Sequence, residues 1–245
     1  MAKSPSENSS HDPITPEFFS EFLSRFGLTS FGVFEFSEDL FRTADDAELG
    51  QSAILIGNVG SEMWYPFVQS AEYADSRPDP MNRWTSRIIN ELAAATNSKA
   101  LYPFDKPYWP FQKFAGKALN VQPSPMGILI HPEYGLWHAF RAVLVFDEPA
   151  EVLRLQISVP SETGVQDHPC DTCLDKPCLS SCPVGAIDDN GLNPTNCFSH
   201  LKTGSDPDCM KIGCEARNAC PVGAANRYCA EQIQFHMKHY YKGRM

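Results

Sequence analysis

Apolar residues recur at helical spacing in several stretches of the first 120 residues. A repeat at positions i, i+3, i+4 and i+7 indicates an amphipathic helix with one buried face. Proline at a first helical position and glycine after the last apolar residue set the expected ends. The pattern predicts helices over residues 16–26, 62–73, 81–96 and 110–119.

Other stretches are short, rich in β-branched residues and bounded by Gly, Pro or Asn, which is typical of buried strands. They predict strands over 52–60, 99–104 and 152–159, and two further strands within 127–146 joined at the turn HPEYG. Strands and helices interleave, so the first part is expected to be an α+β sheet with helices packed on it.

Hydrophobic periodicity disappears from about residue 164, where Gly, Pro, Asp, Asn and Cys dominate. Such a segment has too few large apolar residues for a core of its own and needs a metal to hold it together. A final apolar pattern predicts a helix over 226–241 that packs back onto the first part. We therefore expect a disordered lead (1–13), a sheet domain (14–163), a cysteine-rich domain (164–225) and a closing helical segment (226–245).

Composition excludes several classes of function. The 245 residues are 42% hydrophobic, enough for a real core, and carry a formal net charge of −10 without a basic stripe. Nucleic-acid binding relies on clustered Lys and Arg, so no nucleic-acid partner is expected. No run reaches the roughly 18 apolar residues of a membrane span, and the N-terminus has no apolar signal region. We expect a cytoplasmic protein with no membrane partner.

All nine cysteines lie between Cys170 and Cys229, and CPVGA occurs twice, at 182–186 and 220–224. An odd count without a secretory signal disfavours disulfides and favours metal. The spacing Cys-x2-Cys-x4-Cys-x3-Cys-Pro, a lone Cys197, then Cys-x4-Cys-x5-Cys-Pro resembles the bacterial ferredoxin pattern with enlarged loops. We expect a bacterial-type ferredoxin-like domain with two 4Fe-4S clusters.

In two-cluster ferredoxins the cysteine before Pro ligates the other cluster. The resemblance therefore implies crossed ligation, with Cys170, Cys173, Cys178 and Cys220 holding one cluster and Cys182, Cys197, Cys209 and Cys214 the second. Cys229 is left over and is expected to be a packed thiol. Two structural zinc sites, or one cluster with stray thiols, are the alternatives.

The first domain has no dinucleotide-binding, P-loop, zincin or hydrolase motif. Its stretch SPMGILIHPEYGLWHAFRAVLVF, residues 124–146, resembles the cobalamin-processing family of the type C methylmalonic aciduria disorder. The matching positions are Gly127, Ile130-His131-Pro132, Gly135, Trp137 and Arg141. That resemblance implies a nitroreductase-like fold and a cobalamin ligand; in that family the arginine matching Arg141 binds glutathione.

A nitroreductase-like fold followed by two ferredoxin clusters also occurs in epoxyqueuosine reductases and corrinoid reductive dehalogenases. NCFSHLKTG, residues 196–204, resembles the epoxyqueuosine reductase segment that supplies an isolated cluster ligand, which supports Cys197. The first domain is shorter than in the dehalogenases, and Asp105 is only the nearest candidate for the reductase's catalytic Asp. The resemblance therefore implies architecture and a cobalamin-type ligand, not those activities, and the catalytic residues stay unassigned.

Residue chemistry gives the 124–146 hairpin a means of holding such a ligand. Gly127 and Gly135 allow close backbone approach, Tyr134 and Trp137 offer apolar faces, Arg141 can bind an anion, and His131 completes the candidate site. Each also has a structural reading: His131 as a turn residue, Trp137 as core and Arg141 as a strand-end ion pair.

The leading hypothesis is an iron-sulfur oxidoreductase that passes electrons from two 4Fe-4S clusters to a bound cobalamin, for cobalt reduction or upper-ligand removal. Its partners would be an electron donor protein and a corrinoid or other small-molecule acceptor. The alternatives are an FMN-dependent electron-transfer reductase and a non-catalytic ferredoxin-type carrier with a partner-docking domain. Retained yellow flavin would indicate the second, and clusters without a tight cobalamin or flavin the third.

Overall fold

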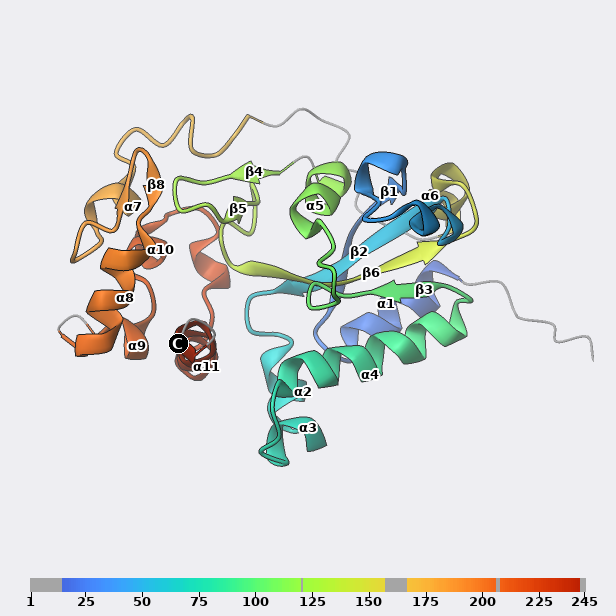
Figure 1. Cartoon of the computed structure of the whole chain (residues 1–245), viewed down its shortest axis with the longest axis horizontal. Coiled ribbons are helices and arrows are strands. Elements are labelled where there is room, and N and C mark those ends of the chain that lie inside the picture. Colours follow the sequence, from blue (N-terminus) through green and yellow to red (C-terminus); the bar gives the residue numbers. More distant parts are fainter. Residues whose placement is uncertain (1–14, 120, 157–166, 206–207, 243–245) are drawn as a thin grey trace, which may run out of the picture.

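The structure is a computed structural model that describes residues 15–119, 121–156, 167–205 and 208–242. The expected lead over 1–13 lies outside the described residues, as does part of the strand expected over 152–159. Figure 1 shows a sheet with its helices in one part of the molecule and the cysteine-bearing short helices in another.

The centre of the first part is a four-stranded antiparallel sheet of order β1-β2-β6-β3. The strands are β1 (Thr29–Glu35), β2 (Ser52–Val59), β6 (His138–Phe146) and β3 (Lys99–Leu101). Ile54 of β2 pairs with Leu144 of β6 and with Val33 of β1. Strand β2 is buried along nearly its whole length because both faces of the sheet are covered, which explains its continuous apolar sequence.

Helices α1 (Pro16–Ser24) and α4 (Pro80–Ala95) cover one face. Thr15 caps α1 by accepting a hydrogen bond from the Phe18 amide at 3.2 Å, and Pro16 starts the helix. In α4 the apolar positions Trp84, Ile88 and Leu92 are buried at helical spacing. Helix α5 (Phe111–Leu119) and an aromatic cluster around Phe34 and Phe114 cover the other face.

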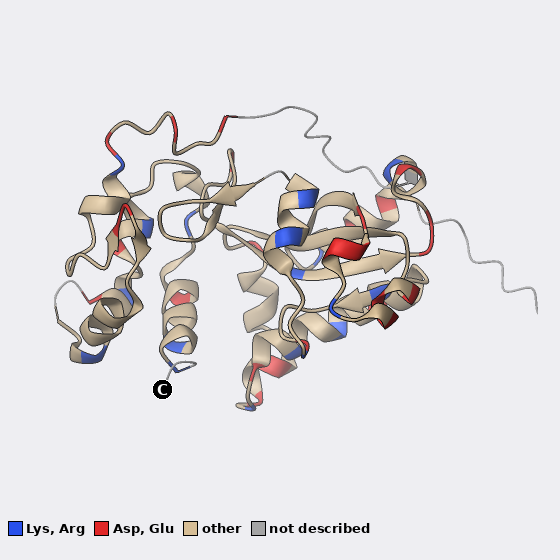
Figure 2. Cartoon of the chain, turned by 45° about the horizontal axis from the view of Figure 1, so that its top comes forward, with Lys and Arg blue, Asp and Glu red and all other residues tan. Residues whose placement is uncertain are grey.

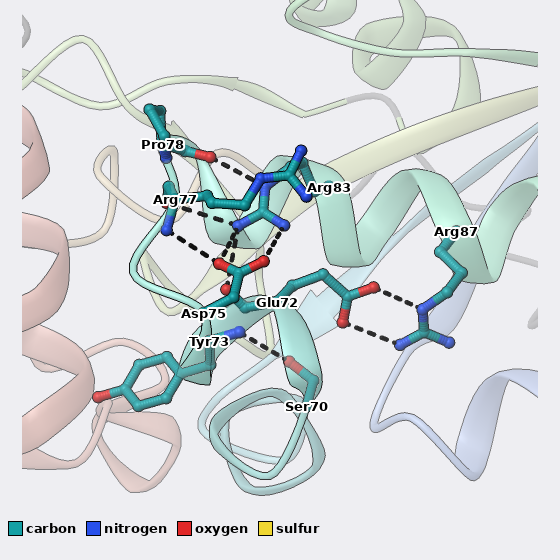
Figure 3. Close-up of polar contacts among 8 residues, drawn as sticks. All are labelled: Ser70, Glu72, Tyr73, Asp75, Arg77, Pro78, Arg83 and Arg87. Carbon is teal, nitrogen blue, oxygen red and sulfur yellow. Dashed lines mark hydrogen bonds and ion pairs between the residues drawn. The ribbon is translucent and has the colours of Figure 1, made fainter.

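The helix expected over 62–73 is two shorter helices, α2 (Trp64–Val68) and α3 (Ala71–Ala74). The break falls at Ser70, whose hydroxyl accepts from the Tyr73 amide and caps the second helix. Arginines of α4 then fix α3: Arg83 donates to both Asp75 carboxylate oxygens at 2.7 and 2.8 Å, and Arg87 donates to Glu72 at 2.6 Å (Figure 3).

The two strands expected within 127–146 are confirmed as β5 (Leu129–Ile130) and β6, joined through a bridge between His131 and Gly135. Strand β5 pairs with β4 (Gln122–Pro123) in a separate two-stranded sheet. The strand expected from residue 152 is wrong: α6 (Ala150–Gln156) occupies this stretch. Ala150 and Leu153, three residues apart, are both buried against the sheet, so helical spacing decided the element.

The cysteine-rich segment is built from short elements: α7 (Pro177–Ser180), β7 (Ile187–Asp188), β8 (Gly191–Leu192), α8 (Pro194–Thr203), α9 (Cys209–Ile212) and α10 (Glu215–Ala219). Three short 3-10 helices complete the described structure at Glu38–Leu40, Ala44–Glu48 and Ala224–Asn226. The expected α+β sheet with packed helices is confirmed. The bacterial-type ferredoxin-like domain stays a prediction.

Helix α11 (Ala230–Lys242) lies between the two parts, as Figure 1 shows. Its Phe235 ring lies 5.3 Å from the Trp64 ring and 5.4 Å from that of Phe67, within the core of the first part. On another side Ile233 contacts Gly213 of the cysteine-rich segment. The closing helix therefore ties the two parts together.

Figure 2 shows both the basic and the acidic positions scattered over many elements of the described ribbon. Among the helices that the structure describes, none combines the length and the apolar character needed to cross a membrane.

Candidate functional site

Four cysteines from distant parts of the segment line one small cavity. They are Cys170, Cys173, Cys178 and Cys220, together called the first quartet. The rest of the wall is mainly proline and apolar side chains. Burial and the three neighbouring thiols raise the pKa of Cys170 to about 11. Three consecutive loop thiols and one from the second CPVGA sequence therefore meet in an apolar pocket.

A second small cavity is lined by the second quartet, Cys182, Cys197, Cys209 and Cys214. Burial raises the pKa of Cys209 to about 11, with Cys214 and Cys182 among the nearby thiols. The cysteine of the first CPVGA sequence thus lies with the later cysteines, and that of the second with the earlier ones. The structure brings together the two sets of four that crossed ligation requires.

Local turns and helix starts position these thiols. Pro177 starts α7 directly before Cys178, and Pro194 starts α8, which carries Cys197. The Ala186 amide donates to the Cys182 sulfur at 3.2 Å, so the CPVGA turn folds back over its own cysteine. Amide-to-sulfur bonds of this kind tune the potential of a cluster held by such thiolates.

Within the described ranges, no group of three or more Cys, His, Asp or Glu side chains converges on a single metal-ion position. A structural zinc site requires four ligands at about 2.0–2.3 Å from one ion. In a cubane each thiolate binds a different iron, so the four sulfurs need not share one centre.

A larger cavity of about 520 Å³ lies where the sheet, the cysteine-rich segment and α11 meet, and we call it the chamber. Its wall includes Arg141 and His138 from β6, Cys197 and Cys214 from the second quartet, and Arg217 and His236 from α10 and α11. This volume is within the ordinary range of small-molecule sites. The chamber therefore lies between the domain predicted to bind a ligand and the cysteines predicted to hold the clusters.

Arg141 is hydrogen-bonded to a buried asparagine. Its Nε donates to Oδ1 of Asn58 at 2.9 Å, and Asn58 Nδ2 donates to the Gly60 carbonyl at 3.3 Å. The Nη2 atom of Arg141 is shielded from solvent and has no hydrogen-bond partner among the residues that the structure describes. Among the described residues no carboxylate pairs with it, so the strand-end ion pair considered from the sequence is not seen there.

Arg217 enters from the cysteine-rich segment. Its guanidinium lies 4.4 Å from the Trp137 ring centre and 4.9 Å from that of Tyr228, and its Nη2 donates to the Leu136 carbonyl. The Nε atom of Arg217 is buried and has no hydrogen-bond partner in the described part of the chain. Two guanidinium groups thus border one apolar chamber.

The two chamber histidines are neutral at physiological pH. Burial, with smaller contributions from nearby His131 and Arg217, lowers the pKa of His138 to about 4. Burial, together with Arg141 and Arg217, lowers the pKa of His236 to about 3. Both His138 Nδ1 and His236 Nε2 are buried and have no hydrogen-bond partner within the described ranges. The chamber therefore offers two cations and two neutral imidazoles.

We expect these two histidines to make the fold sensitive to acid. Their folded pKa values lie below the ordinary value near 6.5, so the unfolded chain binds more protons as pH falls from about 6.5 towards 4. Each imidazole then removes up to about 1.4 kcal/mol of stability per pH unit. Denaturant unfolding between pH 7.5 and 5 measures this effect. The free energy of unfolding should fall less steeply with decreasing pH for His236→Gln than for the wild type. His239→Gln, at an exposed site on the same helix, is the control, and equal slopes in all three would contradict the assignment.

Of the six hairpin residues predicted to hold a ligand, Arg141 alone lines the chamber as described. His131 is only 2% exposed, and its Nδ1 accepts hydrogen bonds from the Glu133 and Tyr134 amides, as expected of a turn residue. Tyr134 stacks on the His131 ring at 4.2 Å. Trp137 is 1% exposed and does not line the chamber itself, but it contacts the chamber residues Arg217 and Tyr228.

The hairpin glycines divide into two cases. Gly127, with φ of +74°, has open space where a Cβ would lie. A Cβ on Gly135 would lie 1.9 Å from the Val222 carbonyl oxygen, and a Cβ on Gly223 would lie 2.2 Å from the Tyr134 carbonyl carbon. The close approach predicted at Gly135 is therefore to the second CPVGA turn, backbone against backbone.

Two other residues singled out in the sequence have structural roles. Asp105 accepts a hydrogen bond from the Tyr102 amide at 2.8 Å and closes a local turn. Cys229 is partly buried against the core of the first part, and its amide donates to the Ser61 hydroxyl at 2.7 Å. Cys229 packs as expected of the ninth cysteine.

Sequence reasoning missed Arg217 and His236. Arg217 lies within the five residues between Cys214 and Cys220, where an extra-long loop beside a ligand was the available signal. His236 lies on the closing helix, and nothing in the periodicity of that helix separates it from a solvated position. Only the packing of α11 between the two parts places it in the chamber wall.

No protein-family model matches the chain, and no curated protein sequence matches it. It is similar to an epoxyqueuosine reductase solved with an epoxyqueuosine-modified tRNA-Tyr stem loop, at 17% identity, over 85% of this chain and 64% of that one, with a TM-score of 0.45. An epoxyqueuosine reductase from Bacillus subtilis is similar at 15% identity over 82% and 62%, with a TM-score of 0.43. The chain thus spans less than two thirds of the length of these reductases.

A C. elegans B12-trafficking protein, CblC, is similar at 15% identity over 89% of this chain and 88% of that one, with a TM-score of 0.48. Motifs of the present sequence resemble those of both kinds of protein. All these identities are below 20% and all these TM-scores are below 0.5. One of these structures contains tRNA; that the present chain binds no nucleic acid stays a prediction.

Proposed function

We propose that this chain is an iron-sulfur oxidoreductase that passes electrons from two 4Fe-4S clusters to a cobalamin bound at the junction of its two parts. The observation that carries the proposal is the chamber, whose wall contains Cys197 and Cys214 on one side and Arg141 on the other. Each electron that leaves the chain is replaced by one from a reduced electron-carrier protein.

The thiols suit iron-sulfur clusters in number, placement and surroundings. The first quartet would hold one cluster and the second quartet the other, each in an apolar cavity. Such clusters supply one-electron transfer at potentials set by burial and hydrogen bonds to sulfur. The chain contributes both, through buried Cys209 and Cys220 and through the Ala186 amide on Cys182.

The fit to cobalamin rests on fewer residues than the sequence suggested. Arg141 can hold an anionic group, and the open side of Gly127 leaves room beside the chamber residues Met126 and Ile128. His131 does not suit a metal ligand, because its Nδ1 accepts two backbone amides and its ring stacks on Tyr134. We therefore assign no axial ligand to this chain.

FMN is the second candidate, favoured by a specific observation. Its phosphate would suit the chamber wall, where Arg141 and Arg217 each keep a buried N–H group without a partner. A yellow protein after purification, with flavin released on denaturation, would select this candidate. A carrier without either cofactor would keep its clusters and bind neither ligand tightly.

Mixing the anaerobically reconstituted protein with hydroxocobalamin is expected to shift the corrin absorption spectrum, because binding changes the surroundings of the corrin. Adding a one-electron reductant should then reduce the cobalt faster in the wild type than in Cys182→Ser, which loses a second-quartet thiol but leaves Arg141 in place. No spectral shift at high protein concentration would exclude cobalamin. Equal reduction rates would exclude the second cluster as the immediate donor.

A further inference from the structure

We propose that the hydroxyl of Ser124, a residue of the sheet part, donates a hydrogen bond to a sulfide of the cluster held by the first quartet and so raises the reduction potential of that cluster. The presence of the cluster rests on the proposed function. The position of Ser124 in the wall of the first-quartet cavity rests on the structure alone.

The Ser124 hydroxyl is buried and unpaired. The residue is 6% exposed, and its Oγ atom is shielded from solvent. Within the described ranges this atom has no hydrogen-bond partner, the four thiols of the first quartet included. A buried hydroxyl without a partner is costly, so each such group in a folded protein requires an explanation. Because Ser124 lines the cavity of the first quartet, we expect its acceptor inside that cavity.

The turn between β4 and β5 fixes the backbone of Ser124. Its amide donates to the Ile128 carbonyl at 2.8 Å, and its carbonyl accepts from the Gly127 amide at 2.8 Å. Pro123 and Pro125 flank the serine and restrict the backbone on either side. Both backbone groups of Ser124 are therefore satisfied within the turn, and the hydroxyl remains to bind a group in the cavity.

An apolar cluster holds this turn against the cysteine-rich segment. The packed side chains are Met126, Ile130 and Leu136 from the sheet part and Ile187, Ala216 and Cys220 from the segment. Because Cys220 is itself a member of the first quartet, this packing sets where the serine lies relative to a predicted cluster ligand. The sheet part thus contributes a polar side chain on a fixed turn to the surroundings of the first cluster.

The composition of the cavity wall gives this hydroxyl its effect. Apart from the thiols, the polar side chains among the described lining residues are those of Ser124 and Lys176, and Lys176 is exposed. Water and salt screen an exposed charge, whereas a buried hydroxyl acts in a medium of low polarity. Reduction adds one negative charge to a cluster, so a donor to its sulfur stabilises the reduced form more than the oxidised form.

A redox titration of Ser124→Ala, followed by EPR, tests this hydrogen bond. The equilibrium constant for reduction of the first cluster is expected to fall about tenfold, which lowers the midpoint potential by about 59 mV for a one-electron couple. The second cluster should keep its potential, since Ser124 is not among the described residues that line the second cavity. Cys173→Ser and Cys209→Ser, which each remove one cluster, assign the two potentials. Ser124→Thr keeps the hydroxyl and should keep the wild-type potential.

Thr85→Val is the matched control. Thr85 is 2% exposed, and its hydroxyl is also buried without a partner among the described residues. It lies on α4 and lines neither quartet's cavity as described. Valine replaces the hydroxyl with a methyl group, so this variant removes a buried hydroxyl without changing the wall of either cavity. Both midpoint potentials should remain those of the wild type.

An unchanged first potential in a Ser124→Ala protein that keeps all its iron would overturn the proposal, because the hydroxyl would then have no acceptor on the cluster. Equal shifts of both potentials, or the alanine potential in Ser124→Thr, would overturn it as well. So would loss of the first cluster from Ser124→Ala, since the serine would then hold the segment in place rather than tune the cluster. A wild type without iron rejects the proposed function, whereas intact clusters that are insensitive to Ser124 reject this inference alone.

Discussion

Cys220→Ser is expected to remove the cluster of the first quartet and to leave that of the second, so that iron falls from about eight to about four atoms per chain. Cys220 belongs to the second CPVGA sequence, yet it lines the same cavity as Cys170, Cys173 and Cys178. A serine hydroxyl in place of the thiol removes a soft ligand that iron-sulfur chemistry requires.

The identity of the missing cluster can be read by comparison. The EPR spectrum of reduced Cys220→Ser should match that of Cys173→Ser, which alters the same quartet. The spectrum of Cys182→Ser should match that of Cys209→Ser. Cys229→Ser, which touches neither quartet, should keep all the iron and both signals. If Cys220→Ser instead matched Cys209→Ser, the clusters would not be crossed.

Gly223→Ala is expected to destabilise the protein far more than Gly185→Ala, although both glycines occupy the same place in CPVGA. Both have a left-handed backbone, with φ of +64° and +56°, so an alanine strains each by about 1–2 kcal/mol. A Cβ on Gly223 would also lie 2.2 Å from the Tyr134 carbonyl carbon, whereas one on Gly185 meets nothing within 4 Å. Such overpacking costs about 1–3 kcal/mol more.

The Tm of the anaerobic holoprotein measures this difference, at about 2–4 °C for each kcal/mol in a protein of this size. Gly135→Ala changes the hairpin side of the same contact. It should lower the Tm by a similar amount to Gly223→Ala. Gly185→Ala is the matched control for backbone strain alone. Equal losses at Gly185 and Gly223 would show that the contact with the hairpin carries no energy of its own.

The two CPVGA sequences therefore differ in what surrounds them. In both, the cysteine lines the cavity of the opposite half of the cysteine-rich segment. Only the second turn also packs its glycine against the 131–135 hairpin. The contact places Arg217, only six residues earlier, beside Trp137 of the sheet part. The second copy thus packs directly against the sheet part, which places it next to the residues that form the chamber.

Much of the fold could be predicted from the sequence. The helices α1, α4 and α5 and the strands β2, β5 and β6 follow from apolar spacing and from Pro and Gly at their ends. Strand β1 went unrecognised because Gly32 and the polar ends of TSFGVFE weaken its pattern. Helix α6 was mistaken for a strand because Val and Leu fit either element over so short a stretch.

The sequence by itself determined the chemistry on one side of the chamber, because ligand type and spacing are local properties. Nine cysteines with two Cys-Pro endings predict two sets of four before any fold is known. The tertiary structure decided the other side. It buried His131 and Gly135 in backbone contacts and left Arg141 facing the chamber with Arg217 and His236. Those three residues come from β6, α10 and α11, and only packing between distant segments makes them neighbours, which no periodicity encodes.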